Sequence, residues 1–120
     1  MREGPLFPAT EPGSREGTLV LRLDGPWTLG NAPPVRAHLQ ALRPPVLIVE
    51  MSGVPYIDSA AVGDLMQAYV SATNAGRIFL LAGVTNHVMA LFYLIKVHNI
   101  LPMYPSVTAA EKAAARRKRR

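Results

Sequence analysis

The stretch that most constrains the fold runs from Val46 to Ala75 and combines a strand, a loop and a helix. It begins with the mostly apolar residues VLIVEM (46–51), bounded by Pro44-Pro45 and Ser52-Gly53, which is typical of a strand buried in a parallel sheet. It continues into apolar residues spaced as one face of a helix, namely Val62, Leu65, Met66, Tyr69 and Val70. The sequence therefore predicts a buried strand that leads directly into an amphipathic helix.

The loop between this strand and this helix is VPYIDS (54–59), and its last two residues are polar. Ser59 is predicted as the helix N-cap, so that its replacement by alanine should cost about 1 kcal/mol. Asp58 is suited to fix the turn by accepting hydrogen bonds from backbone amides. A hydroxyl at the amino end of a helix is also a position where added negative charge is well tolerated.

The rest of the chain alternates strands and helices. The patterns predict strands at 18–23, 78–81 and 101–104, with helices from Pro34, from Asn86 to about Val97, and after Ser106 or Thr108. Leu19, Leu21 and Leu23 alternate with Val20 and Arg22, which indicates a half-buried strand. We expect an α/β fold in which a small mixed, mostly parallel β-sheet is packed with about four α-helices.

The length of 120 residues predicts one domain, at residues 18–114. Residues 1–17 are rich in Pro, Gly and Glu and are expected to be loosely ordered, although Leu6 and Phe7 could form a short edge strand. Residues 115–120 form a basic tail. Without RRKRR (116–120), the rest of the chain contains as many basic as acidic residues. The body of the domain therefore gives no sign of a nucleic-acid interface. The tail itself is suited either to keep the protein in solution or to attach weakly to anionic lipid or nucleic acid.

The composition also bears on the compartment. The absence of cysteine excludes disulfides and suits a reducing cytoplasm. Residues near the amino terminus include several prolines and no apolar run, so no signal peptide is expected. The longest strongly apolar run, Val88 to Ile95, is shorter than the roughly 20 residues that span a bilayer. We therefore expect a cytoplasmic protein without stable membrane insertion.

The residues MSGVPYIDSAAVG (51–63) resemble the signature of STAS domains, the anti-sigma factor antagonist family, where a strand ends in the phrase LS-x-V-x-x-I/M-D-S-S/A-G-L-G. The Asp-Ser pair, Gly63 and the following helix carry the specific part of this resemblance, which extends from about Leu19 to Glu111. This chain has Ala61-Val62 where the family usually has Gly-Leu. We expect these larger side chains to restrict how closely a partner approaches the turn.

The resemblance implies an anti-sigma factor antagonist, which binds an anti-sigma factor that is often a serine kinase and so frees a sigma factor for transcription. It further implies that the kinase phosphorylates Ser59 and that a PP2C-type phosphatase reverses the modification. The expected partner-binding residues are Asp58, Ser59, Ala60, Ala61, Asp64, Met89 and Tyr93. We expect Asp58 and Asp64 to repel a partner together with the phosphate, whereas Met89 and Tyr93 are equally suited to pack on the terminal helix.

The sequence gives no sign of catalysis, a metal site or a cofactor. A nucleophilic serine needs a base such as histidine, and none of His38, His87 and His98 lies in a catalytic motif or at metal-ligand spacing. No phosphate-binding glycine loop is present either. We expect a protein that is not an enzyme and needs no cofactor. Two alternatives remain open, a STAS subunit of a lipid-transport ABC complex and a scaffold subunit of a stress-signalling assembly.

Overall fold

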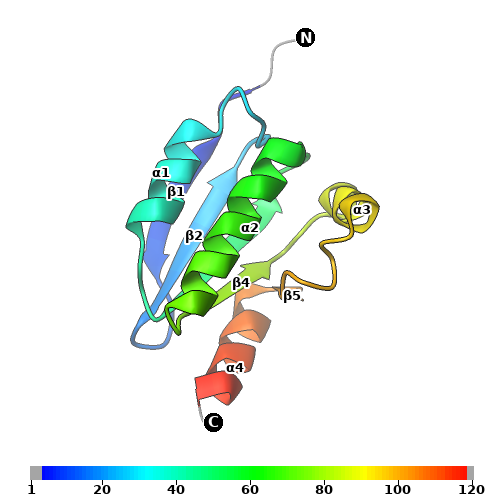
Figure 1. Cartoon of the computed structure of the whole chain (residues 1–120). Coiled ribbons are helices and arrows are strands. Elements are labelled where there is room, and N and C mark those ends of the chain that lie inside the picture. Colours follow the sequence, from blue (N-terminus) through cyan, green and yellow to red (C-terminus); the bar gives the residue numbers. More distant parts are fainter. Residues whose placement is uncertain (1–3, 119–120) are drawn as a thin grey trace.

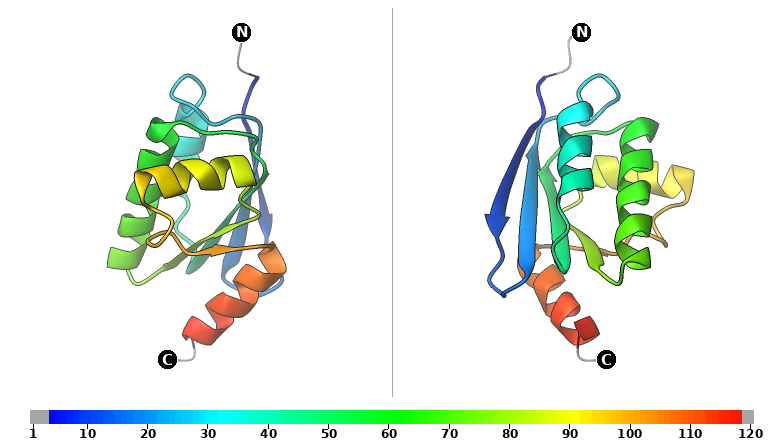
Figure 2. Two further views of the ribbon diagram at one scale, coloured as in Figure 1. Left: turned by 90° about the vertical axis from the view of Figure 1, so that its right-hand side faces the viewer. Right: turned by 60° about the vertical axis from the view of Figure 1, so that its left-hand side comes forward.

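The computed structural model describes residues 4–118, which form a sheet covered by helices on both faces (Figures 1 and 2). The strands are β1 (Phe7–Pro12), β2 (Thr18–Asp24), β3 (Val46–Gly53), β4 (Ile78–Ala82) and β5 (Met103–Tyr104). The helices are α1 (Pro33–Ala41), α2 (Ser59–Asn74), α3 (Asn86–Ile95) and α4 (Val107–Lys118). This architecture confirms the predicted α/β fold with its mixed, mostly parallel sheet.

The strands follow one another across the sheet in chain order. β1 and β2 form an antiparallel hairpin, and β2 to β5 run parallel. Because parallel crossovers are right-handed, connections that advance in one direction place their helices on the same face of the sheet. α1, α2 and α3 share that face, whereas α4 follows the last strand and covers part of the other (Figure 2).

The main core lies between the sheet and the helices α1 to α3. Trp27, Leu65 and Phe92 are among its largest fully buried side chains. A smaller core lies on the other face, where Val20 of β2 packs with Ala110 of α4. The prediction of a half-buried β2 was therefore wrong at Val20, which α4 covers, and right at Arg22 of the same face, which is exposed.

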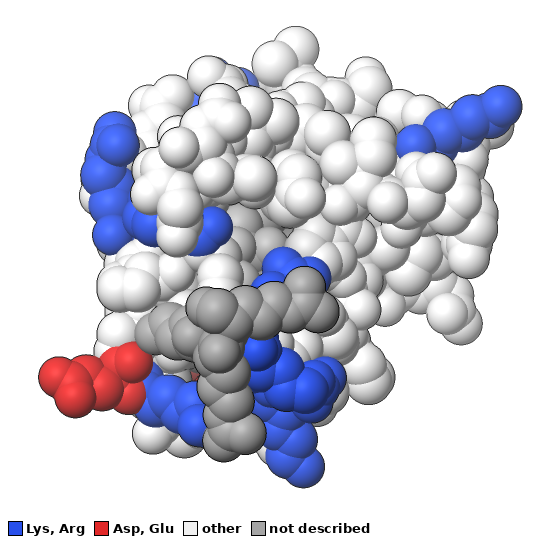
Figure 3. All heavy atoms as spheres, turned by 60° about the horizontal axis from the view of Figure 1, so that its bottom comes forward, with Lys and Arg blue, Asp and Glu red and all other residues white. Residues whose placement is uncertain are grey.

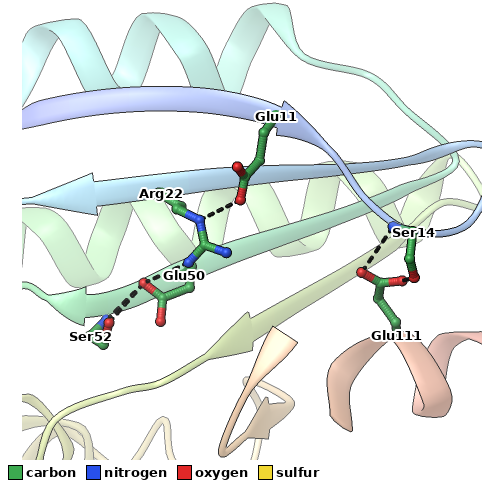
Figure 4. Close-up of polar contacts among 6 residues, drawn as sticks. All are labelled: Glu11, Ser14, Arg22, Glu50, Ser52 and Glu111. Carbon is green, nitrogen blue, oxygen red and sulfur yellow. Dashed lines mark hydrogen bonds and ion pairs between the residues drawn. The ribbon is translucent and has the colours of Figure 1, made fainter. Parts of the chain in front are cut away.

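α4 starts after Ser106, whose hydroxyl accepts a hydrogen bond from the Ala109 amide at 3.1 Å. Ser106 is thus the cap, rather than Thr108. Ser14 in the β1–β2 connection bonds to Glu111 and ties the hairpin to this helix (Figure 4). α4 continues to Lys118, so the predicted tail begins within a helix; residues 119–120 lie outside the described part.

The amino-terminal segment is more regular than predicted. β1 occupies residues 7–12 and pairs with residues 19–24 of β2, while residues 1–3 lie outside the described part. Proline is tolerated here because β1 is an edge strand. Arg22 of β2 forms ion pairs with Glu11 of β1 and Glu50 of β3, where α4 does not cover the sheet (Figure 4).

Two element ends differ from the prediction. α3 begins as expected, with the Thr85 hydroxyl accepting from the Val88 amide at 3.3 Å, but it ends at Ile95 rather than Val97. Lys96 adopts a left-handed conformation, with φ at 68°, and stops the helix. β5 is shorter than predicted.

Within residues 4–118, no helix combines the length and apolar character needed to cross a membrane.

Candidate functional site

The signature turn, residues 54–59, consists of the loop after β3 and the first residue of α2. Its backbone is held by neighbouring loops at several points. The Trp27 amide donates to the Tyr56 carbonyl at 3.1 Å, and the Asp58 amide donates to the Trp27 carbonyl at 3.2 Å. The Thr85 hydroxyl donates to the Val54 carbonyl at 3.3 Å. These bonds fix the position of the amino end of α2.

Asp58 is the N-cap of α2. Its backbone is extended, and one carboxylate oxygen accepts from the Ala61 amide at 3.1 Å. The other oxygen accepts from the Leu29 amide at 2.9 Å. The prediction that Asp58 fixes the turn through backbone amides is confirmed. The prediction that Ser59 is the cap was wrong, because Ser59 is already the first residue of the helix and Asp58 makes the capping bond.

Ser59 is exposed at the start of α2. Among residues 4–118, none forms a hydrogen bond with its hydroxyl. Gly63 lies four residues further along, on the same face of the helix, and is also exposed. A Cβ atom on Gly63 would meet no atom within 4 Å. The packing of the domain therefore does not require glycine at this position.

Ala61 and Val62 do not lie on this surface. Their side chains are buried in the main core, at 0% and 4% exposure. Our expectation that they restrict the approach of a partner was wrong, because both side chains point away from solvent. Ala61 likewise presents no side chain for partner binding, whereas Ala60 is half-buried and reaches the surface.

Asp64 lies apart from Ser59. Five residues of α-helix correspond to a rotation of about 140° around the axis, which turns Asp64 towards α1. There one of its carboxylate oxygens accepts from Arg36 Nε at 3.1 Å, and its side chain is only 10% exposed. The expectation that Asp64 adds to the repulsion beside Ser59 is therefore contradicted.

Met89 and Tyr93 on α3 differ in their surroundings. Met89 is half-buried and packs against the main core. Tyr93 is 59% exposed, and its ring stacks on His98 with 4.2 Å between the ring centres. The alternative that these residues pack on the terminal helix was wrong, because α4 lies on the other face of the sheet.

Sequence reasoning missed several exposed apolar side chains. Leu94 near the end of α3 is the most exposed of them, and Ile95 and Ile100 are exposed as well. The signal was present in the sequence, since VMALFYLI (88–95) is apolar around the whole helix, more than one buried face requires. Leu29 was also missed, and it is exposed next to the amide that Asp58 binds.

The STAS domain model matches residues 11–110, which include every strand of the sheet at least in part and the signature turn. The chain belongs to the STAS domain family. No curated protein sequence matches this STAS domain. Solved structures do resemble it, at identities that show the fold alone.

Three of these structures place the STAS domain among proteins of different roles. An anti-sigma factor antagonist from Mycobacterium paratuberculosis superposes with a TM-score of 0.82 at 19% identity, covering 92% of this chain and 94% of that one. A sulfate transporter family protein from Wolinella succinogenes gives 0.74 at 24% identity, covering 84% and 87%. The Bacillus cell fate determinant SpoIIAA in its phosphorylated form gives 0.65 at 15% identity, covering 89% and 99%.

Proposed function

We propose that this STAS domain is an anti-sigma factor antagonist, a protein-binding switch that acts through the amino end of α2. The observation that carries the proposal is the exposed Ser59 hydroxyl, which has no hydrogen-bond partner among the described residues while Asp58 performs the capping. A structural hydroxyl would be expected to make the capping bond itself. Ser59 is therefore accessible for modification without loss of the helix start.

The surface around Ser59 is suited to a protein partner. Gly63 leaves open space on the same helical face, so a partner backbone can approach closely. Leu29 adds an exposed apolar side chain on the neighbouring loop, whose backbone is fixed by Asp58. We assign the docking surface to Asp58, Ser59, Ala60, Gly63 and Leu29, with Tyr93 of α3 as a further contact.

Phosphorylation at Ser59 would act through charge. A phosphate adds about −1.5 to −2 charges at neutral pH, and the amino end of α2 stabilises such a charge within the free domain. The carboxylate of Asp58 precedes it in the chain, and a partner that covers both groups must desolvate them. The modified domain therefore stays folded but binds the anti-sigma factor more weakly. One of the similar structures is the Bacillus cell fate determinant SpoIIAA in its phosphorylated form, which supports this mechanism.

We further propose that the domain is not an enzyme. Nucleophilic catalysis by Ser59 would require a base within hydrogen-bond reach. His38 bonds instead to the Pro34 carbonyl at 2.8 Å, and His98 stacks on Tyr93. A kinase that is itself the anti-sigma factor and a PP2C-type phosphatase would supply the chemistry at Ser59.

The test begins with capture of the partner from the organism that encodes the chain, followed by mass spectrometry. Titration calorimetry then compares the wild type, Ser59→Ala, Ser59→Asp and, as a matched control, Thr73→Ala, which removes an exposed hydroxyl at the far end of α2. We expect Ser59→Asp to bind more weakly and the two alanine variants to bind normally. Incubation with the kinase and ATP should add one phosphate to the wild type and to Thr73→Ala, and none to Ser59→Ala.

Equal affinity of all four proteins, without phosphate after kinase treatment, would contradict the switch. The likeness to a sulfate transporter family protein favours a second candidate, in which the domain is a subunit of a transport complex. Capture of a permease and an ATPase in place of a kinase would support that candidate. Capture of a large multi-subunit assembly would support the scaffold alternative.

A further inference from the structure

A pocket lies between α1 and α2, at the end of the molecule where the parallel strands begin. Its enclosed part has a volume of only about 90 Å³, and the rest is a groove open to solvent, so an elongated ligand would lie along it partly exposed. Its floor is apolar and comes from Leu39 of α1, Leu47 of β3 and Phe79 of β4. These three side chains are buried or nearly so, which makes the floor a fixed surface.

The outer part of the pocket is cationic. Arg43 follows α1 and Arg77 precedes β4, and both line the pocket. Within residues 4–118, the ion pairs involve neither of these two arginines. Figure 3 shows this end of the molecule, where basic side chains dominate the charged surface. An anionic group at the mouth of the pocket would therefore be attracted and could bind a guanidinium through two hydrogen bonds.

The inner part of the pocket has the opposite character. Asp64 lines it, and its carboxylate is paired through one oxygen with Arg36. The second oxygen is buried and has no hydrogen-bond partner among the described residues. A second anionic group at this position would be repelled, whereas a hydroxyl could donate to the carboxylate. Asp64 and Ser71 are seven residues apart on α2, a separation of about 11 Å along the helix axis, and both line the pocket.

We propose that this pocket binds an amphipathic organic anion, with one anionic head at Arg43 and Arg77 and an apolar body of medium-chain length on the floor. The far end of the ligand lies near Asp64 and is neutral or carries a hydroxyl. Decanoate has about the required length. The site is separate from the docking surface, because none of the residues assigned to that surface lines the pocket.

The test uses calorimetry and NMR on the full chain with four probes, each kept below its solubility limit and below any concentration at which it forms micelles. We expect decanoate and ω-hydroxydecanoate to bind saturably and to shift the amides of Ser71 and Arg77. Decanedioate should bind at least about tenfold more weakly, because its second carboxylate meets Asp64, and decanol should lose a similar factor without an anionic head. Equal affinity for decanoate and decanol would contradict the proposal.

Two variants keep the test decisive. Arg77→Gln removes one guanidinium from the mouth and should weaken decanoate binding about tenfold. Ser71→Phe fills the pocket and should abolish binding, with Thr73→Phe as the matched control on a different face of α2. Unchanged binding by both Arg77→Gln and a folded Ser71→Phe would overturn the assignment. Since no partner protein is involved, failure here leaves the proposed switch at Ser59 untouched.

Discussion

The two ends of α2 meet the surroundings in different ways. At the amino end, Asp58 satisfies two backbone amides, and the exposed face presents a serine hydroxyl and a glycine. At the carboxyl end, the helix forms one wall of a pocket with an apolar floor and with arginines that have no ion pair among the described residues. One end thus presents an exposed surface, and the other lines a pocket.

This difference indicates two kinds of recognition by one helix. An exposed surface with small side chains lets a macromolecule approach the backbone, whereas a pocket with an apolar floor can bury part of a small molecule. Arg36 and Asp64 lie between the two regions, since they pair across α1 and α2 and also line the pocket. The following variants test whether the two ends are as independent as their geometry indicates.

The largest effect is expected from Asp58→Ala. It removes the cap and leaves the Ala61 and Leu29 amides without their acceptor, so the free energy of unfolding should fall by about 2 kcal/mol. Urea unfolding followed by the fluorescence of the buried Trp27 measures this, with an unchanged m-value as evidence for a loss of stability alone. Asp58→Asn keeps an acceptor and should lose less. An Asp58→Ala protein as stable as the wild type would show that the turn is fixed without the carboxylate.

A smaller effect of opposite sign is expected from Gly63→Ala. Because a Cβ there meets open space, better helix propensity should raise the free energy of unfolding by up to about 1 kcal/mol. The same methyl group should weaken binding of the proposed anti-sigma factor partner, since it occupies the proposed docking surface. Decanoate binding should stay constant. If partner affinity does not change, the surface is not centred on this face of α2.

Ser59→Ala should change the free energy of unfolding by less than about 0.5 kcal/mol, as is usual for exposed positions. This is less than the 1 kcal/mol that the sequence alone suggested, because Asp58 rather than Ser59 makes the capping bond. Thermal and urea unfolding beside the wild type give the measurement. A loss near 1 kcal/mol would mean that the hydroxyl has a structural role that the hydrogen bonds do not reveal.

The smallest effect on stability is expected from deletion of residues 116–120. Arg116 and Arg117 are exposed, and the last buried residue of α4 is Ala114. The truncated protein should retain its unfolding midpoint and its decanoate affinity, but lose binding to heparin and to anionic vesicles. Vesicle binding that survives the deletion and disappears in Arg77→Gln would assign lipid attachment to the pocket instead of the tail.

Local order along the chain was largely predictable. The β3–α2 segment and the Thr85 cap follow from hydrophobic periodicity and capping chemistry, which depend on near neighbours in the sequence. The prediction was wrong on the choice between two adjacent capping residues. That choice depends on backbone conformation, because Asp58 is extended and is also bonded to Leu29 of a distant loop.

The sequence by itself determined the STAS signature, the alternation of strands and helices, and the presence of a serine at the start of α2. Only the tertiary structure decided which side chains around that serine are free. Asp64 pairs with Arg36 of another helix, α4 lies on the opposite face from α3, and the pocket joins residues of α1, α2, β3 and β4. These relations arise from the handedness of the crossovers and the register of the sheet, which bring together residues that periodicity along the chain treats separately.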